Sequence, residues 1–152
     1  MILVPKELLE TIIEHVRMEA PREACGWLAG EGNEAGGVYP VPNVAEDPEV
    51  GFRMDPEIQL STMREIRDLG LELTGTYHSH PRTPPAPSVR DRGLAAYSKT
   101  VHLIVSLAAS EPEVRCYRIQ EGMCTAVELT VGPPVRWEGR LRSRVYPGRG
   151  LL

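Results

Sequence analysis

The 152-residue sequence has few cysteines and no long apolar segment, and each shortage argues against a class of protein. Its three cysteines, Cys25, Cys116 and Cys124, are odd in number and lack the spacing of metal ligands, which argues against a disulfide framework and suits a reducing compartment. No apolar run approaches the roughly 18 residues that a membrane span needs, so no membrane partner is expected. The first residues, Met1 to Lys6, also lack the basic and apolar parts of a secretory signal, and we expect a cytoplasmic location.

The sequence has no strong excess of charge of either sign. A net charge of -4 gives no general reason to expect a nucleic-acid partner. Arginine is concentrated only near the C-terminus, where a solvated extension is the plain interpretation and contact with an acidic partner is the alternative. We therefore predict one domain over residues 1–131, followed by an Arg/Gly/Pro-rich extension over residues 132–152. The sequence does not determine the oligomeric state, and a homodimer is one of the open alternatives.

Two segments have the apolar periodicity and the end signals of helices. Residues 5–19 place Leu8, Ile12 and Val16 on one helical face. A second helix is predicted to begin with Asp55 as its N-cap, to have Pro56 at its first position and to end at Gly70. A short third helix is predicted over residues 89–97, after the proline-rich loop 81–87.

Strand-forming segments alternate with these helices. The segments 25–31 and 37–44 predict a hairpin, because a turn-rich stretch separates them. Further strands are predicted over residues 71–80, 100–107, 114–120 and 124–131. The later connections are too short for crossovers, so antiparallel pairing is expected there. The predicted fold class is therefore α/β (α+β), with one mixed β-sheet flanked by helices.

The most informative segment is His78-Ser79-His80-Pro81, which is followed by Ser88 and Asp91. Residues two apart on a strand point to the same face, so both imidazoles can converge on one ion. Pro81 ends the strand, and the stiff loop can return the chain so that Asp91 supplies a third ligand. Three protein ligands leave one coordination position open, which is typical of catalytic zinc.

Each of these residues also has a plainer interpretation. Two histidines at this spacing can be a polar pair at a strand end, and Ser88 to Asp91 has the pattern of a helix capping box. For Asp91 we expect these roles to compete, because an oxygen bound to zinc cannot readily cap a helix as well. A hydrolase also needs a proton carrier and an oxyanion donor, for which Glu23 and Ser88 are candidates. Sequence position alone does not separate Glu23 from an ordinary exposed carboxylate.

Taken together, these residues resemble the motif of the JAMM metalloproteases of the MPN domain family. The motif is an upstream glutamate, here in Pro21-Arg22-Glu23-Ala24-Cys25-Gly26, then His-x-His-Pro, six residues, and Ser-x-x-Asp. The resemblance covers residues 1–131 and implies a cytidine-deaminase-like sheet flanked by helices. It implies that His78, His80 and Asp91 are zinc ligands, that Glu23 is the general acid/base and that Ser88 hydrogen-bonds the developing oxyanion. No role is assigned to Asn43, Phe52 or Met54.

The resemblance also implies a function. Active members hydrolyse peptide or isopeptide bonds after the C-terminal Gly-Gly of ubiquitin or ubiquitin-like proteins, and the chain is similar to the small prokaryotic branch that processes sulfur-carrier proteins. We therefore expect a zinc metallopeptidase or isopeptidase with a ubiquitin-like or sulfur-carrier protein substrate. The alternatives are a catalytically silent binding scaffold of the same fold and a zinc hydrolase of a small-molecule amide. A deaminase is disfavoured, because neither His-x-Glu nor Cys-x-x-Cys is present.

Overall fold

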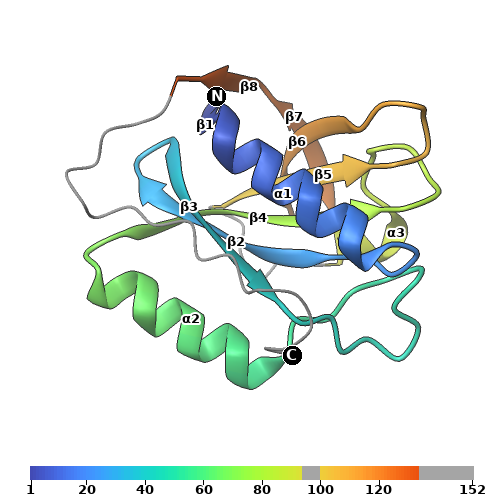
Figure 1. Ribbon diagram of the computed structural model, residues 1–152, viewed down its shortest axis with the longest axis horizontal. Coiled ribbons are helices and arrows are strands. Elements are labelled where there is room, and N and C mark those ends of the chain that lie inside the picture. The colour runs from blue at the N-terminus through green and yellow to red at the C-terminus, as the bar shows by residue number, and fades with distance from the viewer. Residues whose placement is uncertain (94–99, 134–152) are drawn as a thin grey trace.

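A computed structural model describes residues 1–93 and 100–133 of the chain, and these form an eight-stranded sheet with helices on both faces (Figure 1). The strand order is β7-β6-β5-β4-β2-β3-β1-β8. The pairs β4·β5, β1·β3 and β1·β8 are parallel and the other neighbouring pairs are antiparallel, which confirms the predicted mixed sheet. The strands are β1 (Ile2–Pro5), β2 (Cys25–Glu31), β3 (Glu34–Val41), β4 (Glu72–His80), β5 (Val101–Ser106), β6 (Glu113–Gln120), β7 (Met123–Val127) and β8 (Leu129–Gly132).

The two long helices cover opposite faces of this sheet. Helix α1 (Lys6–Glu19) buries Leu8, Ile12 and Val16 against one face, as its periodicity predicts. Helix α2 (Pro56–Asp68) packs on the other face, where Ile66 joins a second apolar cluster. The Asp55 carboxylate accepts hydrogen bonds from the backbone N–H groups at positions 57 and 58, so the predicted N-cap is confirmed. A short helix, α3 (Val89–Arg92), lies at one end of the sheet (Figure 1).

The central strands are buried on both sides. In β2, Trp27 belongs to the cluster under α2 and Leu28 to the cluster under α1, and neither side chain is exposed to solvent. The predicted hairpin between β2 and β3 is confirmed, with Gly32 at a φ of 60° in its turn. Because β4 lies between β2 and β5, the end of β4 is held on both sides by the sheet. A side chain at that end is therefore placed by well-packed backbone.

Two parts of the sheet differ from the sequence prediction. Strand β1 was not predicted at all, and the single strand predicted over residues 124–131 is wrong. Strand β7 pairs with β6 only as far as Val127, and after Glu128 the chain continues as β8, which pairs in parallel with β1 at the other edge of the sheet. Since one residue separates β7 from β8, the two edges of the sheet come close there, and the sheet curves around α1 (Figure 1).

Two predicted segments extend beyond the described residues. The short helix begins at Val89 as predicted, but residues 94–97 of its predicted length lie outside the described part of the chain. The predicted C-terminal extension also lies outside it, apart from residues 132 and 133. Within the described ranges, no helix has the length and apolar character needed to cross a membrane.

Candidate active site

The two histidines of the motif meet at the end of the central strand β4. His78 and His80 are two residues apart and point to the same face, the one that α2 covers, so their Nε2 atoms lie 3.2 Å apart. Both side chains are buried, with exposed fractions of 1% and 4%. Phe52 stacks on the His78 ring at a centroid distance of 4.5 Å and fixes its plane. The predicted convergence of the two imidazoles is present.

Asp91 reaches the same point from α3. Its Oδ2 atom lies 3.2 Å from His78 Nε2 and 3.0 Å from His80 Nε2, and the residue is 4% exposed. Asp91 and Ser88 also form the capping box, since the Ser88 N–H donates to Asp91 Oδ2 (2.8 Å) and the Asp91 N–H donates to Ser88 Oγ (3.0 Å). The capping bond and the contacts with both histidines involve one carboxylate oxygen, and whether a bound metal competes with the cap stays a prediction. The same Oδ2 atom accepts the capping bond and faces both histidines, so the cap orients the carboxylate toward the imidazoles.

Glu23 joins this group through the register of the sheet. Cys25 pairs with His78 in the antiparallel ladder between β2 and β4, and the next pair is closed by a hydrogen bond from the Ser79 N–H to the Ala24 carbonyl (3.1 Å). Continued by one more residue, this register sets Glu23 beside His80. One carboxylate oxygen of Glu23 lies within 4.8 Å of one nitrogen from each histidine. The structure therefore brings together Glu23, His78 and His80 as a group that could hold a metal ion.

A loop over residues 42–54 holds the Glu23 backbone in place. The Glu23 N–H donates to the Pro48 carbonyl (2.7 Å), and Asn43 Nδ2 donates to the Glu23 carbonyl (2.9 Å). The same Nδ2 donates to the Gly51 carbonyl (3.1 Å), while Asn43 Oδ1 accepts from two backbone N–H groups of the loop. The Asn43 side chain thus hydrogen-bonds to several backbone groups of the loop and to the backbone of Glu23. This role of Asn43 was not predicted from the sequence, because asparagine favours such loops without indicating which backbone groups it binds.

The hydrogen bonds of the two histidines indicate that a proton or a cation is needed between their Nε2 atoms and Asp91 Oδ2. His80 Nδ1 donates to the Pro84 carbonyl (2.9 Å), so a neutral His80 presents the lone pair of Nε2 to Asp91 Oδ2 and His78 Nε2. Lone pairs and a carboxylate at these distances repel each other unless a proton or a cation lies between them. Two imidazole nitrogens and a carboxylate oxygen are also the donor set that zinc prefers. The residues present therefore fit a divalent metal.

The pKa shifts in the group follow from burial and from these contacts. Burial lowers the pKa of His78. Burial also acts to lower the pKa of His80, but its hydrogen bonds to Asp91 and to the Pro84 carbonyl outweigh that effect and raise it. For Asp91, burial acts to raise the pKa, and the hydrogen bonds from both histidines and from Ser88 bring it well below its usual range. The group therefore holds Asp91 as a carboxylate.

Glu23 differs from Asp91 in having no such partner. Its Oε1 atom is buried without a hydrogen-bond partner among the described residues, and the residue is 5% exposed. Burial raises the pKa of Glu23 to about 7, with His80 acting against the rise. A carboxyl group with a pKa near neutrality can both accept and release a proton at physiological pH. Glu23 is therefore suited to carry protons.

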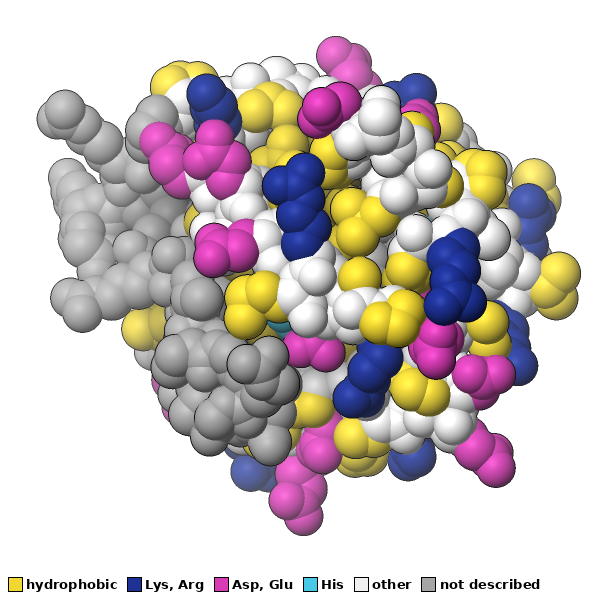
Figure 2. All heavy atoms as spheres, turned by 45° about the vertical axis from the view of Figure 1, so that its right-hand side comes forward, with side chains coloured by type: hydrophobic (Ala, Val, Ile, Leu, Met, Phe, Trp, Pro, Cys, Tyr) yellow, Lys and Arg dark blue, Asp and Glu magenta, His cyan; other side chains and the backbone are white. Residues whose placement is uncertain are grey.

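The group lies beneath the surface of the end of the molecule that carries α3. Figure 2, which turns the right-hand side of Figure 1 toward the reader, shows hydrophobic and charged side chains on this part of the surface, and both histidines of the group are buried. Ser88 is exposed at the edge of the group. Because its Oγ accepts the Asp91 N–H, its hydroxyl hydrogen remains able to donate to a ligand above the histidines.

Comparison with known proteins agrees with this arrangement. Residues 5–120 match the family model described as prokaryotic homologs of the JAB domain. A desampylase from Haloferax volcanii is 39% identical over 64% of this chain and 74% of its own length. A probable TtuB-protein conjugate cleaving protease from Thermus thermophilus is 41% identical over 58% of this chain and 59% of its own length. The CysO-cysteine peptidase of Mycobacterium tuberculosis is 32% identical over 86% of this chain and 90% of its own length.

Solved structures show the same fold. A protein from Desulfitobacterium hafniense, solved in solution, is 34% identical, with a TM-score of 0.79 over 88% of this chain and 94% of its own. A JAB1/MPN domain protein from Archaeoglobus fulgidus is 23% identical, with a TM-score of 0.60 over 86% of this chain and 97% of its own, and it supports the fold alone. From the family match and the relatives together, the chain belongs to the prokaryotic JAB family, and it shares the fold of a JAB1/MPN domain protein.

Proposed function

We propose that the chain is a zinc metallopeptidase or isopeptidase that hydrolyses the bond after the C-terminal Gly-Gly of a ubiquitin-like or sulfur-carrier protein. The observation that carries the proposal is a buried, unpaired carboxylate, Glu23, next to two converging imidazoles. The names of the relatives support the substrate class, since one is named for cleaving TtuB conjugates and another for a CysO-cysteine bond.

We assign the metal to His78, His80 and Asp91. The capping bond from the Ser88 N–H and the hydrogen bond from His80 Nδ1 to Pro84 orient two of these ligands, as outer partners of metal ligands usually do. A bound zinc ion would supply Lewis-acid activation of a water molecule and of the scissile carbonyl. The remaining chemistry falls to the side chains around it.

Glu23 is the proposed proton carrier. It would take a proton from the attacking water and deliver it to the nitrogen of the leaving amine, and a pKa of about 7 suits both steps near neutral pH. The fixed backbone of Glu23, held by Asn43 and Pro48, limits how far the carboxylate can move. Ser88 is the proposed donor to the oxyanion, because its hydroxyl hydrogen is not used by the capping box.

The decisive experiment measures zinc content and cleavage together. The substrate is a ubiquitin-like or sulfur-carrier protein from the same genome that bears a C-terminal adduct after Gly-Gly. The native chain should hold one zinc ion and release the adduct, and a chelator should stop the release. Glu23→Gln should still bind zinc but lose cleavage by about 10²- to 10⁴-fold, the usual contribution of a positioned acid/base.

Glu31→Gln is the matched control, because Glu31 is an exposed carboxylate at the opposite end of β2. It should retain both zinc and cleavage. Full turnover by zinc-loaded Glu23→Gln would rule out the proposed proton carrier. Zinc binding without any cleavage by the native chain would favour the binding scaffold.

A further inference from the structure

The loop over residues 81–87 leads from His80 to α3, so its path sets where Asp91 lies relative to the histidines. Four of its seven residues are proline. Because proline has no backbone N–H, the loop has few donors with which to attach itself to the sheet. The hydrogen bonds that attach it to the sheet are accepted by its carbonyl oxygens instead. Side chains that donate to those carbonyls therefore act on the placement of the proposed metal ligands.

Three successive carbonyls of this loop each accept a hydrogen bond from a different strand. The three strands, β4, β5 and β6, are neighbours in the sheet. The donors and their carbonyls are Ser106 Oγ of β5 to Thr83 (2.6 Å), His80 Nδ1 of β4 to Pro84 (2.9 Å) and the Tyr117 hydroxyl of β6 to Pro85 (2.8 Å). The bond made by the histidine thus lies between two bonds made by residues that are not proposed ligands.

Ser106 is placed beside His80 by the parallel register of β4 and β5, in which the two residues are partners. The Ser106 side chain is fully buried. Its Oγ also accepts a hydrogen bond from the Ala108 N–H (3.1 Å), which leaves the hydroxyl hydrogen for the Thr83 carbonyl. Ser106 therefore fixes the loop at a point next to one of the proposed ligands.

Tyr117 holds the loop from farther along the sheet. It pairs with His102 in the ladder between β5 and β6, and its hydroxyl reaches the Pro85 carbonyl. Pro85 is buried, whereas the residues on either side of it are exposed. Among residues 1–93 and 100–133, no hydrogen bond or ring contact joins Tyr117 to a proposed metal ligand. An effect of the Tyr117 hydroxyl on the ligands therefore passes through the loop.

We propose that Tyr117 and Ser106 are positioning residues that set the metal affinity of the site by holding the loop over residues 81–87. With the carbonyls on either side fixed, the Pro84 carbonyl stays at His80 Nδ1, and the lone pair of Nε2 is left for the metal. The fixed loop also returns the third proposed ligand to the same point. This inference rests on the ligand assignment of the proposed function and extends the site to two strands that carry no ligand.

The test measures zinc affinity by competition with a chelating dye in the native 152-residue chain and in two variants. Tyr117→Phe removes one hydroxyl and keeps the ring, and zinc affinity should fall about 3- to 10-fold, which corresponds to one hydrogen bond. Ser106→Ala should lower it about 10- to 100-fold, because it removes two hydrogen bonds at a fully buried position. With Co²⁺ in place of zinc, the visible absorption of both variants should differ from that of the native chain, because the bands depend on ligand geometry.

Tyr77→Phe is the matched control. The Tyr77 hydroxyl makes a hydrogen bond of similar length (2.7 Å) to His15 on the opposite face of the sheet, and the side chain is fully buried. This variant should lower the Tm at least as much as Tyr117→Phe does and should leave zinc affinity unchanged. Unchanged zinc affinity in Tyr117→Phe or Ser106→Ala would overturn the role of that residue. An equal loss of affinity in Tyr77→Phe would overturn both roles, because it would show a general loosening of the fold.

This result is separate from the outcome of the peptidase test. If the native chain binds zinc and both loop-holding variants bind it more weakly, the inference is supported even when no conjugate is cleaved. If the native chain binds no zinc, the ligand assignment fails, and the positioning roles of Tyr117 and Ser106 fail with it.

Discussion

Asn43 allows the sharpest test of how the loop over residues 42–54 holds the site. The side chain is 7% exposed and makes four good hydrogen bonds to backbone groups, with its amide donating to the carbonyls of Glu23 and Gly51 and its oxygen accepting from the N–H groups of Ala45 and Arg53. Replacement by alanine leaves these four backbone groups without their partner. The substitution therefore tests one side chain that joins the loop to the proton carrier.

The expected destabilisation by Asn43→Ala follows from the number of hydrogen bonds lost and from how buried their partners are. Each bond contributes about 1 kcal/mol net, and an unsatisfied buried group costs about 1 to 3 kcal/mol. Water can replace part of the loss at the loop groups that are less buried, so Asn43→Ala should lower the free energy of unfolding by about 2 to 4 kcal/mol. For a chain of this size, that corresponds to a fall in Tm of about 5 to 15 °C.

Thermal unfolding of the native chain and two variants checks this value. Asn33→Ala is the control, because Asn33 is the other asparagine of the chain and the polar contact that its exposed side chain makes with the described residues is a weak one, 4.0 Å to the Met1 sulfur. It should change the Tm little. Asn43→Ala should also lose turnover while keeping zinc, since Asn43 positions Glu23 and does not contact the proposed ligands. Equal Tm values for the two variants would refute this account of the loop.

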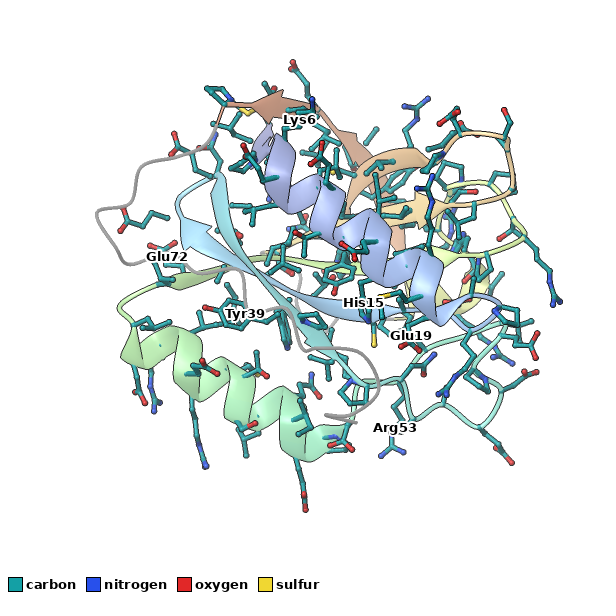
Figure 3. All side chains as sticks on the ribbon, viewed as in Figure 1. Lys6, His15, Glu19, Tyr39, Arg53 and Glu72 are labelled. Atoms are coloured by element: carbon teal, nitrogen blue, oxygen red, sulfur yellow. The ribbon has the colours of Figure 1, made fainter. Side chains whose placement is uncertain are left out.

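Two further predictions concern groups that take no part in the proposed chemistry. His15 faces the sheet from α1 (Figure 3), with Nδ1 2.7 Å from the Tyr77 hydroxyl, and burial lowers its pKa from 6.5 to about 4. Because the unfolded chain binds this proton more readily, the contribution of neutral His15 is present above pH 6.5 and is lost as the pH falls toward 4. We therefore expect the free energy of unfolding, measured with urea, to fall between pH 7 and pH 4.5 by about 2 kcal/mol more in the native chain than in His15→Gln. An identical pH dependence would contradict this role. The second prediction concerns the cysteines, which differ in burial. Cys25 and Cys116 are buried, and burial raises the pKa of both thiols, whereas Cys124 is half-buried. A thiol reagent should modify one cysteine quickly in the native chain and three after unfolding, and rapid native modification of two would refute the assignment.

The parts of the fold that follow from local signals were predicted from the sequence. The apolar spacing of α1, the N-cap of α2 and the turn between β2 and β3 depend on neighbouring residues, and the structure has all three. The meeting of His78 and His80 has the same origin, because alternation along a strand places residues two apart on one face. The capping box of Ser88 and Asp91 is also a local feature, because both residues belong to the first turn of α3.

Pairings between distant segments could not be predicted in this way. Strand β1 is only four residues long, and it is stable as a strand because β3 and β8 pair with its two edges. The run over residues 123–132 has strand character throughout, yet it divides at Glu128 because its two halves have partners at opposite edges of the sheet. Strand propensity does not identify a partner, so the sequence predicted one strand where the fold contains two.

The candidate site also combines features that follow from local sequence with features that depend on tertiary contacts. The sequence by itself determined the donor set and its local spacing, since two histidines end a strand and a capped carboxylate follows a stiff loop. Only the tertiary structure decided that Glu23 lies beside them, because its position depends on the register between β2 and β4 and on the bonds from Asn43 and Pro48. The same is true of Tyr117, whose hydrogen bond to the Pro85 carbonyl joins β6 to the loop that follows β4. Local sequence fixes which groups a strand or helix presents, whereas burial and long-range register fix which of those groups meet.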